Sequence, residues 1–280
     1  MRDVGDISFL IIGSAKCATT WLQRCLQADP AVYMPDPELH FFSREFEKGI
    51  AWYTAQFDCD DRRRLIGEKS NSYIEDPAAA LRIREALPEV KFILQVRNPV
   101  ERAYSDYCML FRRGAVGKRI EDYLDPRNAA DQRFISNGRY AEQLDRYLQI
   151  FPRERFLFLL YENISTKPER QVGQTRRFLE LPDDNVSFVR KQKVKDKTTK
   201  VISPVLKPYL KPFKPLIRPW RSYSAVSAVL AAFRREIAYP PLTDELRARL
   251  VGYYGPHNAR LQSMVDLDLT QWSAPVRQSA

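Results

Sequence analysis

Apolar residues along the chain follow two different spacings. Short continuous apolar runs bounded by small or polar residues are typical of strands that are buried on both faces of a parallel sheet. Such runs predict strands at 9–12, 91–96 and 155–161, and a short strand with a loop at 64–73. Apolar residues at helical spacing predict helices at 21–26, 77–87, 140–151 and 167–179. This alternation predicts an α/β fold with a parallel sheet and crossover helices.

The run at 9–12 is followed by a sequence that favours anion binding. Gly13 ends the strand, Lys16, Thr19 and Thr20 follow, and Trp21 begins the helical spacing. A tight loop of this kind points backbone N–H groups at one spot near the positive end of a helix dipole, where a phosphate binds well. Lys16 comes three residues after Gly13, so the loop is not the nucleotide-binding pattern G-x-x-x-x-G-K-[ST]. An ordinary strand-to-helix turn with an exposed lysine stays open as the alternative.

Composition predicts one globular chain. The 280 residues are 44% hydrophobic and 12% aromatic, which is enough for a full core, and we expect a single domain over 1–280. No apolar run approaches the roughly 18 residues that span a bilayer, and residues 1–6 lack the apolar stretch of a signal peptide, so we expect a soluble, cytoplasmic protein. The four cysteines show no Cys-x-x-Cys pair and there are two histidines, which predicts free thiols and no metal site.

The net charge of +10 is concentrated in one segment. Residues 190–221 contain eleven Lys or Arg and one acid, Asp196, which accounts for the whole excess. Five prolines between 204 and 219 argue against a regular helix there. Three interpretations stay open: a basic loop that closes over a phosphate, a Pro-rich surface at 204–221 that binds an anionic acceptor or a membrane, and a flexible solvated lid.

Glu38 and His40 lie two residues apart in an aromatic segment, which places both side chains on one side of an extended backbone. A poised general base is the functional interpretation. The alternative is that Glu38 caps the following helix and His40 forms a hydrogen bond in the core.

The end of the strand at 91–96 favours one nucleotide chemistry over another. A Mg-dependent NTPase or kinase uses a carboxylate near this position to hold the metal, whereas this strand ends at Arg97. Pro99 starts a helix that carries Ser105 in its first turns. The pattern predicts a nucleotide with phosphates at two places and no metal between them.

Together these motifs resemble the sulfotransferase family that uses 3′-phosphoadenosine 5′-phosphosulfate (PAPS), and most of all the branch with the heparan sulfate sulfotransferases and their bacterial relatives. The motifs are residues 16–20, 38–42, 67–70, 97–99 with Ser105, and 138–140 before the strand at 155–161. The resemblance covers roughly residues 7–180. It implies a P-loop-like parallel sheet flanked by helices. The pattern of residues adds a basic Pro-rich lid within the domain at 190–221 and a helical C-terminal tail.

The resemblance also implies roles for individual residues. The run 16–21 is expected to bind the 5′-phosphosulfate end of PAPS: Lys16, Cys17, Ala18, Thr19, Thr20 and Trp21. Arg97 and Ser105 match residues that hold the 3′-phosphate. A basic loop closes over that phosphate in relatives, which points to Lys193, Lys195 and Lys197. Glu38 matches the base, His40 and Lys69 match residues around the reaction centre, and Lys16 would stabilise the departing phosphate.

Two residues depart from the family pattern. Ala18 replaces the usual glycine, which is tolerable if its φ is negative. Pro37 replaces a lysine that often precedes the glutamate, which leaves the acceptor class open. The acceptor is expected to carry a hydroxyl on a glycan, lipid or small natural product, and no nucleic-acid partner is expected. The alternatives are a Mg-dependent P-loop kinase and a non-catalytic basic protein that binds nucleic acid or membranes.

The remaining segments are expected to serve packing. Thr243 is a suitable N-cap for a helix over 244–254, and Gly255 with Pro256 is expected to end it before a second helix at 258–264. Residues 120–124 and 133–135 are interpreted as lid or loop structure. The oligomeric state is not determined by the sequence.

Overall fold

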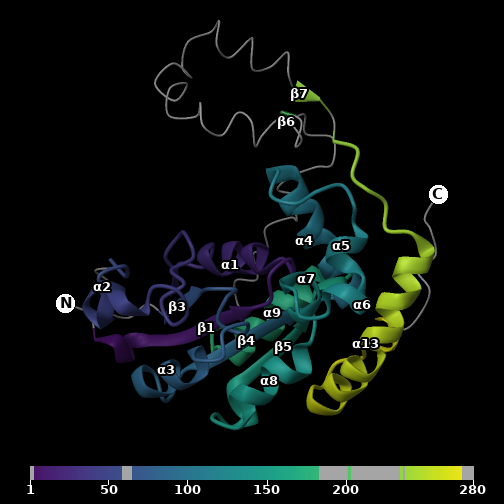
Figure 1. Ribbon diagram of the computed structural model, residues 1–280. Coiled ribbons are helices and arrows are strands. Elements are labelled where there is room, and N and C mark those ends of the chain that lie inside the picture. The colour runs from purple at the N-terminus through teal and green to yellow at the C-terminus, as the bar shows by residue number, and fades with distance from the viewer. Residues whose placement is uncertain (1–2, 59–64, 183–200, 203–233, 236, 273–280) are drawn as a thin grey trace, which may run out of the picture. The chain divides into compact units, whose positions relative to one another are not determined.

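The computed structural model describes residues 3–58, 65–182, 201–202, 234–235 and 237–272 (Figure 1). The chain forms two compact units. The first comprises residues 1–102, 137–191 and 253–280, and the second comprises residues 103–136 and 192–252. The prediction that residues 1–280 form a single domain stays a prediction.

The described part of the first unit contains a five-stranded parallel sheet with the order β2-β3-β1-β4-β5. The strands are β1 (Ile7–Gly13), β2 (Val32–Tyr33), β3 (Leu65–Lys69), β4 (Lys91–Val96) and β5 (Phe156–Leu160). The α/β prediction is therefore confirmed. Strand β1 lies between β3 and β4. From β1 the chain crosses to the edge strand β2 and returns to β3, and it then reverses direction to form β4 and β5 on the other side of β1. Ligands of open parallel sheets bind beyond the carboxyl ends of the strands at such a reversal point.

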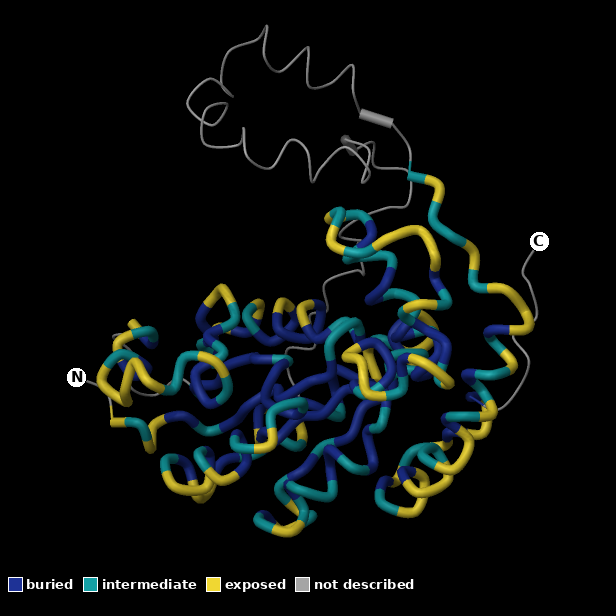
Figure 2. The backbone as a smooth tube through the Cα atoms, viewed as in Figure 1, coloured by how far each residue is buried: buried dark blue, intermediate teal, exposed yellow. Residues whose placement is uncertain are grey.

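Helices cover both faces of this sheet (Figures 1 and 2). Helices α1 (Thr19–Gln27) and α9 (Pro168–Phe178) pack on one face, where Trp21, Leu22 and Val172 contribute to one buried cluster. Helices α3 (Ala79–Ala86) and α8 (Tyr140–Leu148) pack on the other face. The shorter elements of this unit are α2 (Gly49–Thr54), η1 (Val4–Asp6), η2 (Phe46–Lys48), η3 (Arg153–Arg155), η4 (Tyr161–Ile164) and η5 (Thr270–Trp272).

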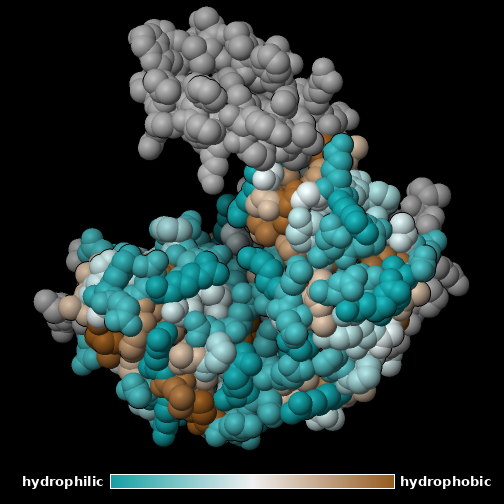
Figure 3. All heavy atoms as spheres, in the orientation of Figure 1, coloured by the Kyte–Doolittle hydropathy of each residue, from teal (hydrophilic) through white to brown (hydrophobic). Residues whose placement is uncertain are grey.

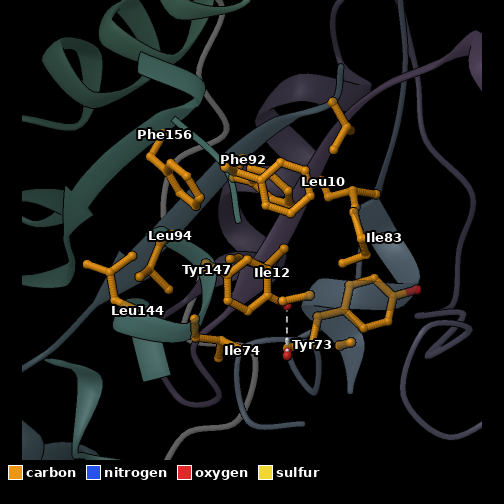
Figure 4. Close-up of a cluster of buried hydrophobic side chains, with 14 of the residues drawn as sticks. Leu10, Ile12, Tyr73, Ile74, Ile83, Phe92, Leu94, Leu144, Tyr147 and Phe156 are labelled. Atoms are coloured by element: carbon orange, nitrogen blue, oxygen red, sulfur yellow. Dashed lines mark hydrogen bonds between the residues drawn. The ribbon is translucent and has the colours of Figure 1, made fainter. Parts of the chain in front are cut away.

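The larger core cluster lies under α3 and α8 (Figure 4). Leu10 and Ile12 of β1 and Phe92 of β4 are fully buried there. The hydroxyl of Tyr147 donates to the backbone oxygen of Tyr73 at 2.9 Å, which joins α8 to the chain that follows β3. Side chains of β1 and β4 are buried on both faces of the sheet. This packing fixes the two central strands, and with them the start of each loop that leaves their carboxyl ends.

The helical tail differs from the prediction at one proline. A single helix, α13 (Asp244–Met264), runs through Pro256, although Gly255 and Pro256 were expected to end it. The ring of a proline usually clashes with the side chain of the residue before it. Gly255 has no side chain to clash with the ring, and the helix continues past the proline.

The described part of the second unit is mostly helical and includes one short pair of strands. It contains most of α4 (Pro99–Arg113), together with α5 (Glu121–Leu124), α6 (Pro126–Ala129) and α7 (Arg133–Ser136). Segments 120–124 and 133–135 were expected to be lid or loop, and the loop interpretation is wrong because they form short helices. Buried Asp106 accepts from Arg133 Nη2 at 3.0 Å, which ties α7 to α4. A short antiparallel pair joins β6 (Val201–Ile202) to β7 (Arg234–Arg235).

The face of the molecule in Figure 3 is largely polar where the structure describes it. Hydrophilic residues cover most of the described part of the face shown in Figure 3, and hydrophobic residues gather only in small groups. Within the residues that the structure describes, no helix combines the length and apolar character needed to cross a bilayer. The cytoplasmic location stays a prediction.

Candidate active site

The loop after β1 depends on a close backbone approach. A Cβ atom on Gly13 would lie 2.4 Å from Cγ2 of Ile74, whose backbone N–H donates to the oxygen of Ile12 at 3.0 Å. The N–H of Ser14 donates to the oxygen of Gln95 on β4 at 2.8 Å. Glycine therefore lets the chain pass close to the segment after β3 where β1 ends. The loop that follows leads to the N-terminus of α1. The first N–H groups of a helix have no acceptor within it and can bind an anion.

Ala18 lies in the left-handed region of backbone space, with φ of 62° and ψ of 29°. The methyl group of Ala18 was expected to be tolerated at a negative φ, but φ is positive in the structure. Lys16, with φ of 70°, is also in this region. A residue with a side chain pays roughly 1–2 kcal/mol in this region, which is the physical reason for a glycine at position 18. The loop of this chain holds strain that a glycine would relieve.

Three residues of the predicted donor-binding run are buried, namely Cys17, Thr19 and Trp21. The thiol of Cys17 is fully buried beside the hydroxyl of Tyr140, at 3.9 Å, and burial raises its pKa to about 12. Trp21 is 8% exposed and packs in the cluster under α1. Cys17, Cys25 and Cys108 form no disulfide among the described residues, and Cys59 lies outside them.

Arg97 lies beside the loop, as the prediction requires. Strands β1 and β4 pair directly, with Gly13 opposite Leu94. Arg97 Nη1 donates to the backbone oxygen of Lys16 at 3.2 Å, and the guanidinium lies 4.2 Å from the ring centre of Tyr161. The carboxyl ends of two neighbouring strands therefore bring Lys16 and Arg97 into one region of the first unit.

Glu38 is held by hydrogen-bond donors from β3 and the segment after it. Its Oε1 accepts from Lys69 Nζ at 2.9 Å and from Asn71 Nδ2 at 3.2 Å. Its Oε2 accepts from the backbone N–H of Asn71 at 3.0 Å and lies 3.8 Å from His40 Nε2. The side chain keeps 24% of its surface exposed. The carboxylate is thus oriented by the protein and still open to a substrate, as a general base must be.

The same donors connect Glu38 to the start of α1. Lys69, which is 4% exposed, also donates to the hydroxyl of Thr20 at 3.0 Å. The hydroxyl of Thr19 donates to Asn71 Oδ1 at 2.8 Å. The structure therefore brings together five of the predicted residues, namely Lys16, Thr19, Thr20, Glu38 and Lys69, at one end of the sheet.

His40 lies at the edge of this cluster. Its Nδ1 is 2.7 Å from the hydroxyl of Ser72, which is 2.6 Å from the hydroxyl of Ser43. Burial lowers the pKa of His40, although the nearby carboxylate of Glu38 opposes this effect. The sequence left open whether Glu38 caps a helix. Its contacts with Lys69 and Asn71 favour the interpretation as a base.

Glu68 belongs to the motif at residues 67–70, but the sequence indicated no role for it. It is 1% exposed, and it accepts hydrogen bonds from Tyr53 at 2.9 Å, from Ser70 at 2.8 Å and from Tyr73. Burial raises the pKa of Glu68 to about 7, while these donors act in the opposite direction. Ser70 also accepts from the backbone N–H of His40 at 2.8 Å. Glu68 therefore supports the segment that carries Glu38 and His40.

Glu162 was missed by the sequence reasoning. It follows β5 closely and is partly buried, and its Oε1 accepts from the backbone N–H of Asn98 at 2.8 Å. The argument against a kinase assumed that no strand-end carboxylate lies near the loop, and this premise is wrong. Glu162 is bound to the backbone at the start of α4. Burial raises its pKa, so its environment disfavours the charged form that a metal ligand needs.

Four predicted donor-binding residues are not placed at the site. Ser105 belongs to the second unit, and its position next to Arg97 stays a prediction. Lys193, Lys195 and Lys197 lie outside the described residues, as does the basic segment 190–221 apart from β6.

Comparison with known proteins agrees with this geometry. The "Sulfotransferase domain" family model matches residues 6–206. The chain is 34% identical over 176 residues to the human heparan sulfate glucosamine 3-O-sulfotransferase 6, covering 61% of this chain and 52% of that protein. It is 29% identical over 195 residues to the bifunctional heparan sulfate N-deacetylase/N-sulfotransferase 1 of Caenorhabditis briggsae, covering 62% of this chain and 22% of that protein.

The fold is also similar to a solved structure, that of a sulfotransferase from Alicyclobacillus acidocaldarius, with a TM-score of 0.69. The similarity covers 96% of this chain and 99% of that one at 24% identity, and it shows the fold. The matched part of the chain spans about half the length of the first of these two curated relatives, and less than a quarter of the length of the second. The family model covers well over half of the 280 residues, and its match agrees with the loop after β1, the residues around Glu38 and the end of β4. The chain belongs to the sulfotransferase domain family.

Proposed function

We propose that this protein transfers a sulfuryl group from PAPS to a hydroxyl group of an acceptor. One observation carries the proposal. The Lys16 loop and Arg97 meet at the ends of paired strands, where Arg97 donates to the backbone of Lys16, and Glu38 is tied to the same helix start through Lys69 and Thr20. Sulfotransferases of this family use PAPS as donor. The cations and helix N-terminus suit its phosphates.

The mechanism follows from what each group can do at this site. Sulfuryl transfer forms a bond from the acceptor oxygen to sulfur and breaks the bond from sulfur to the 5′-phosphate oxygen. Glu38 takes the proton of the acceptor hydroxyl. The electron pair of the broken bond goes to the 5′-phosphate oxygen, and Lys16 and the N-terminus of α1 stabilise the negative charge that this phosphate gains as it leaves. Arg97 binds the 3′-phosphate and so distinguishes PAPS from ATP.

The acceptor is proposed from the relatives and from the site. The names of the relatives describe transfer to heparan sulfate, at oxygen in one case and at nitrogen in the other. In this chain Glu38 presents a carboxylate that accepts a proton, so we favour a hydroxyl of a glycan or lipid-like molecule. The basic segment 190–221 would contribute by closing over the 3′-phosphate through Lys193, Lys195 and Lys197, or by binding an anionic acceptor or membrane through 204–221.

The test is transfer from labelled PAPS to a panel that contains heparan sulfate, simple phenols and lipid alcohols. Glu38→Gln should retain binding of 3′-phosphoadenosine 5′-phosphate (PAP) and lose about 10²-fold or more in kcat, the effect of a lost general base. Glu85→Gln, at an exposed position on α3, is the matched control and should keep full turnover. Near-normal kcat in Glu38→Gln would assign the base to another residue. Stabilisation by ATP with Mg²⁺, but not by PAP, would reject the proposal.

A further inference from the structure

Asn71 connects two parts of the site that the sequence treats separately. It follows β3 by two residues and lies between Glu38 and the first residue of α1. Its backbone N–H donates to Glu38 Oε2 at 3.0 Å, and its side-chain Nδ2 donates to Glu38 Oε1 at 3.2 Å. One residue therefore contacts both oxygens of the same carboxylate.

The orientation of the Asn71 amide is fixed from its other side. The hydroxyl of Thr19 donates to Oδ1 at 2.8 Å, so the oxygen of the amide faces α1 and the nitrogen faces Glu38. An aspartate would keep the acceptor for Thr19 and lose the donor for Glu38. An alanine would lose both and keep only the backbone N–H. Asparagine is the residue of this size that serves both neighbours at once.

We propose that Asn71 is a positioning residue for the transfer reaction, because it fixes the carboxylate of Glu38 and ties it to the start of α1. This inference rests on the proposed function, in which Glu38 takes the acceptor proton next to the donor bound at α1. Lys69 binds only Oε1 of Glu38. Asn71 binds both oxygens, Oε2 through its backbone N–H and Oε1 through its side chain. Asn71 thus sets the direction in which the carboxylate faces the acceptor, and misplacement of a reacting group is costly.

The charged groups around Glu38 determine how an Asn71 variant should respond to pH. Lys69 donates to the carboxylate, His40 Nε2 lies 3.8 Å from Oε2, and the buried carboxyl of Glu68 acts on it from β3. Removal of the Asn71 side chain takes one donor from the charged form of Glu38, so that carboxylate should hold a proton more tightly. Asn71→Asp adds a second carboxylate at the same place and should strengthen the effect.

The experiment compares Asn71→Ala, Asn71→Asp and Asn71→Ser with wild type and with Asn163→Ala, a control at an exposed asparagine of the same unit. It measures kcat with labelled PAPS across pH and the Kd of PAP by calorimetry. Asn71→Ala should lose about tenfold to a hundredfold in kcat, on the scale of a hydrogen bond to a charged group. The acidic limb of its kcat profile should move to higher pH, and further still in Asn71→Asp. The Kd of PAP should change by less than about threefold, since Lys16 and Arg97 remain.

Two results would overturn the role of Asn71. One is that the wild type is active and Asn71→Ala has the same kcat as the wild type. The other is a variant that loses turnover and PAP affinity by the same factor with an unchanged pH profile, which is the behaviour of general structural damage. If Asn71→Ala does not fold, the comparison of Asn71→Asp with Asn71→Ser applies, and equal pH profiles in those two would also overturn the role. A wild type that neither binds PAP nor transfers label would instead reject the proposed function itself.

Discussion

Replacement of Glu68 by glutamine tests the electrostatics of the buried carboxyl beside the site. The pKa of Glu68 is raised by burial from a usual value of 4.5 to about 7. The folded protein therefore holds this proton more tightly than the unfolded chain does, and protonation favours the folded state. The contribution of Glu68 to the free energy of unfolding is complete below about pH 4.5 and is lost as the pH rises through about 7. A shift of this size corresponds to about 3 kcal/mol of unfolding free energy.

Urea unfolding followed by tryptophan fluorescence measures this contribution, because Trp21, Trp52 and Trp272 all lie in the first unit. Glutamine keeps an oxygen that accepts from the tyrosine hydroxyls and does not titrate. The stability of wild type minus that of Glu68→Gln should therefore fall by about 3 kcal/mol from pH 4.5 to pH 8. Tyr53→Phe removes a donor that favours the charged form, which raises the pKa of Glu68 in the folded state, so the decline should extend to higher pH. A difference that stays constant with pH, or grows as the pH rises, would refute the reasoning.

Two further predictions concern the donor loop. Ala18→Gly should raise the free energy of unfolding by about 1 kcal/mol, because it relieves the left-handed backbone, whereas Ala28→Gly at a right-handed position should lower it; urea midpoints check both, and equal losses would contradict the strain. Arg97→Ala should weaken PAP binding by about 1.5–3 kcal/mol while leaving the affinity for adenosine 5′-phosphate nearly unchanged; calorimetry with both nucleotides checks this, and an equal loss for the two would separate Arg97 from the 3′-phosphate.

The sequence predicted the central part of the fold because buried parallel strands have a simple signature. The runs that became β1, β4 and β5 are continuous and apolar, since both of their faces are covered. The Lys16 loop was recognisable because glycine, lysine and two threonines follow a strand directly. Local patterns of this kind specify an anion site without any knowledge of the tertiary structure.

The rest of the site depends on contacts between residues far apart in the chain. Asn71 meets Glu38 across 33 positions, and no local pattern marks that pairing. Glu68 lies within a strand, where a carboxylate is unexpected, and its hydroxyl partners Tyr53 and Tyr73 come from separate segments. The left-handed backbone of Ala18 and the helix through Pro256 show the same limit, because both conformations run against the usual preference of the residue at that position.

The most direct test of the account is a crystal structure of the protein with PAP bound. The account predicts the 5′-phosphate at the N-terminus of α1 beside Lys16, the 3′-phosphate at Arg97, and the carboxylate of Glu38 facing the open side of the 5′-phosphate. A nucleotide bound elsewhere, or one whose 3′-phosphate points away from Arg97, would contradict the central claim that the ends of β1 and β4 grip a single donor.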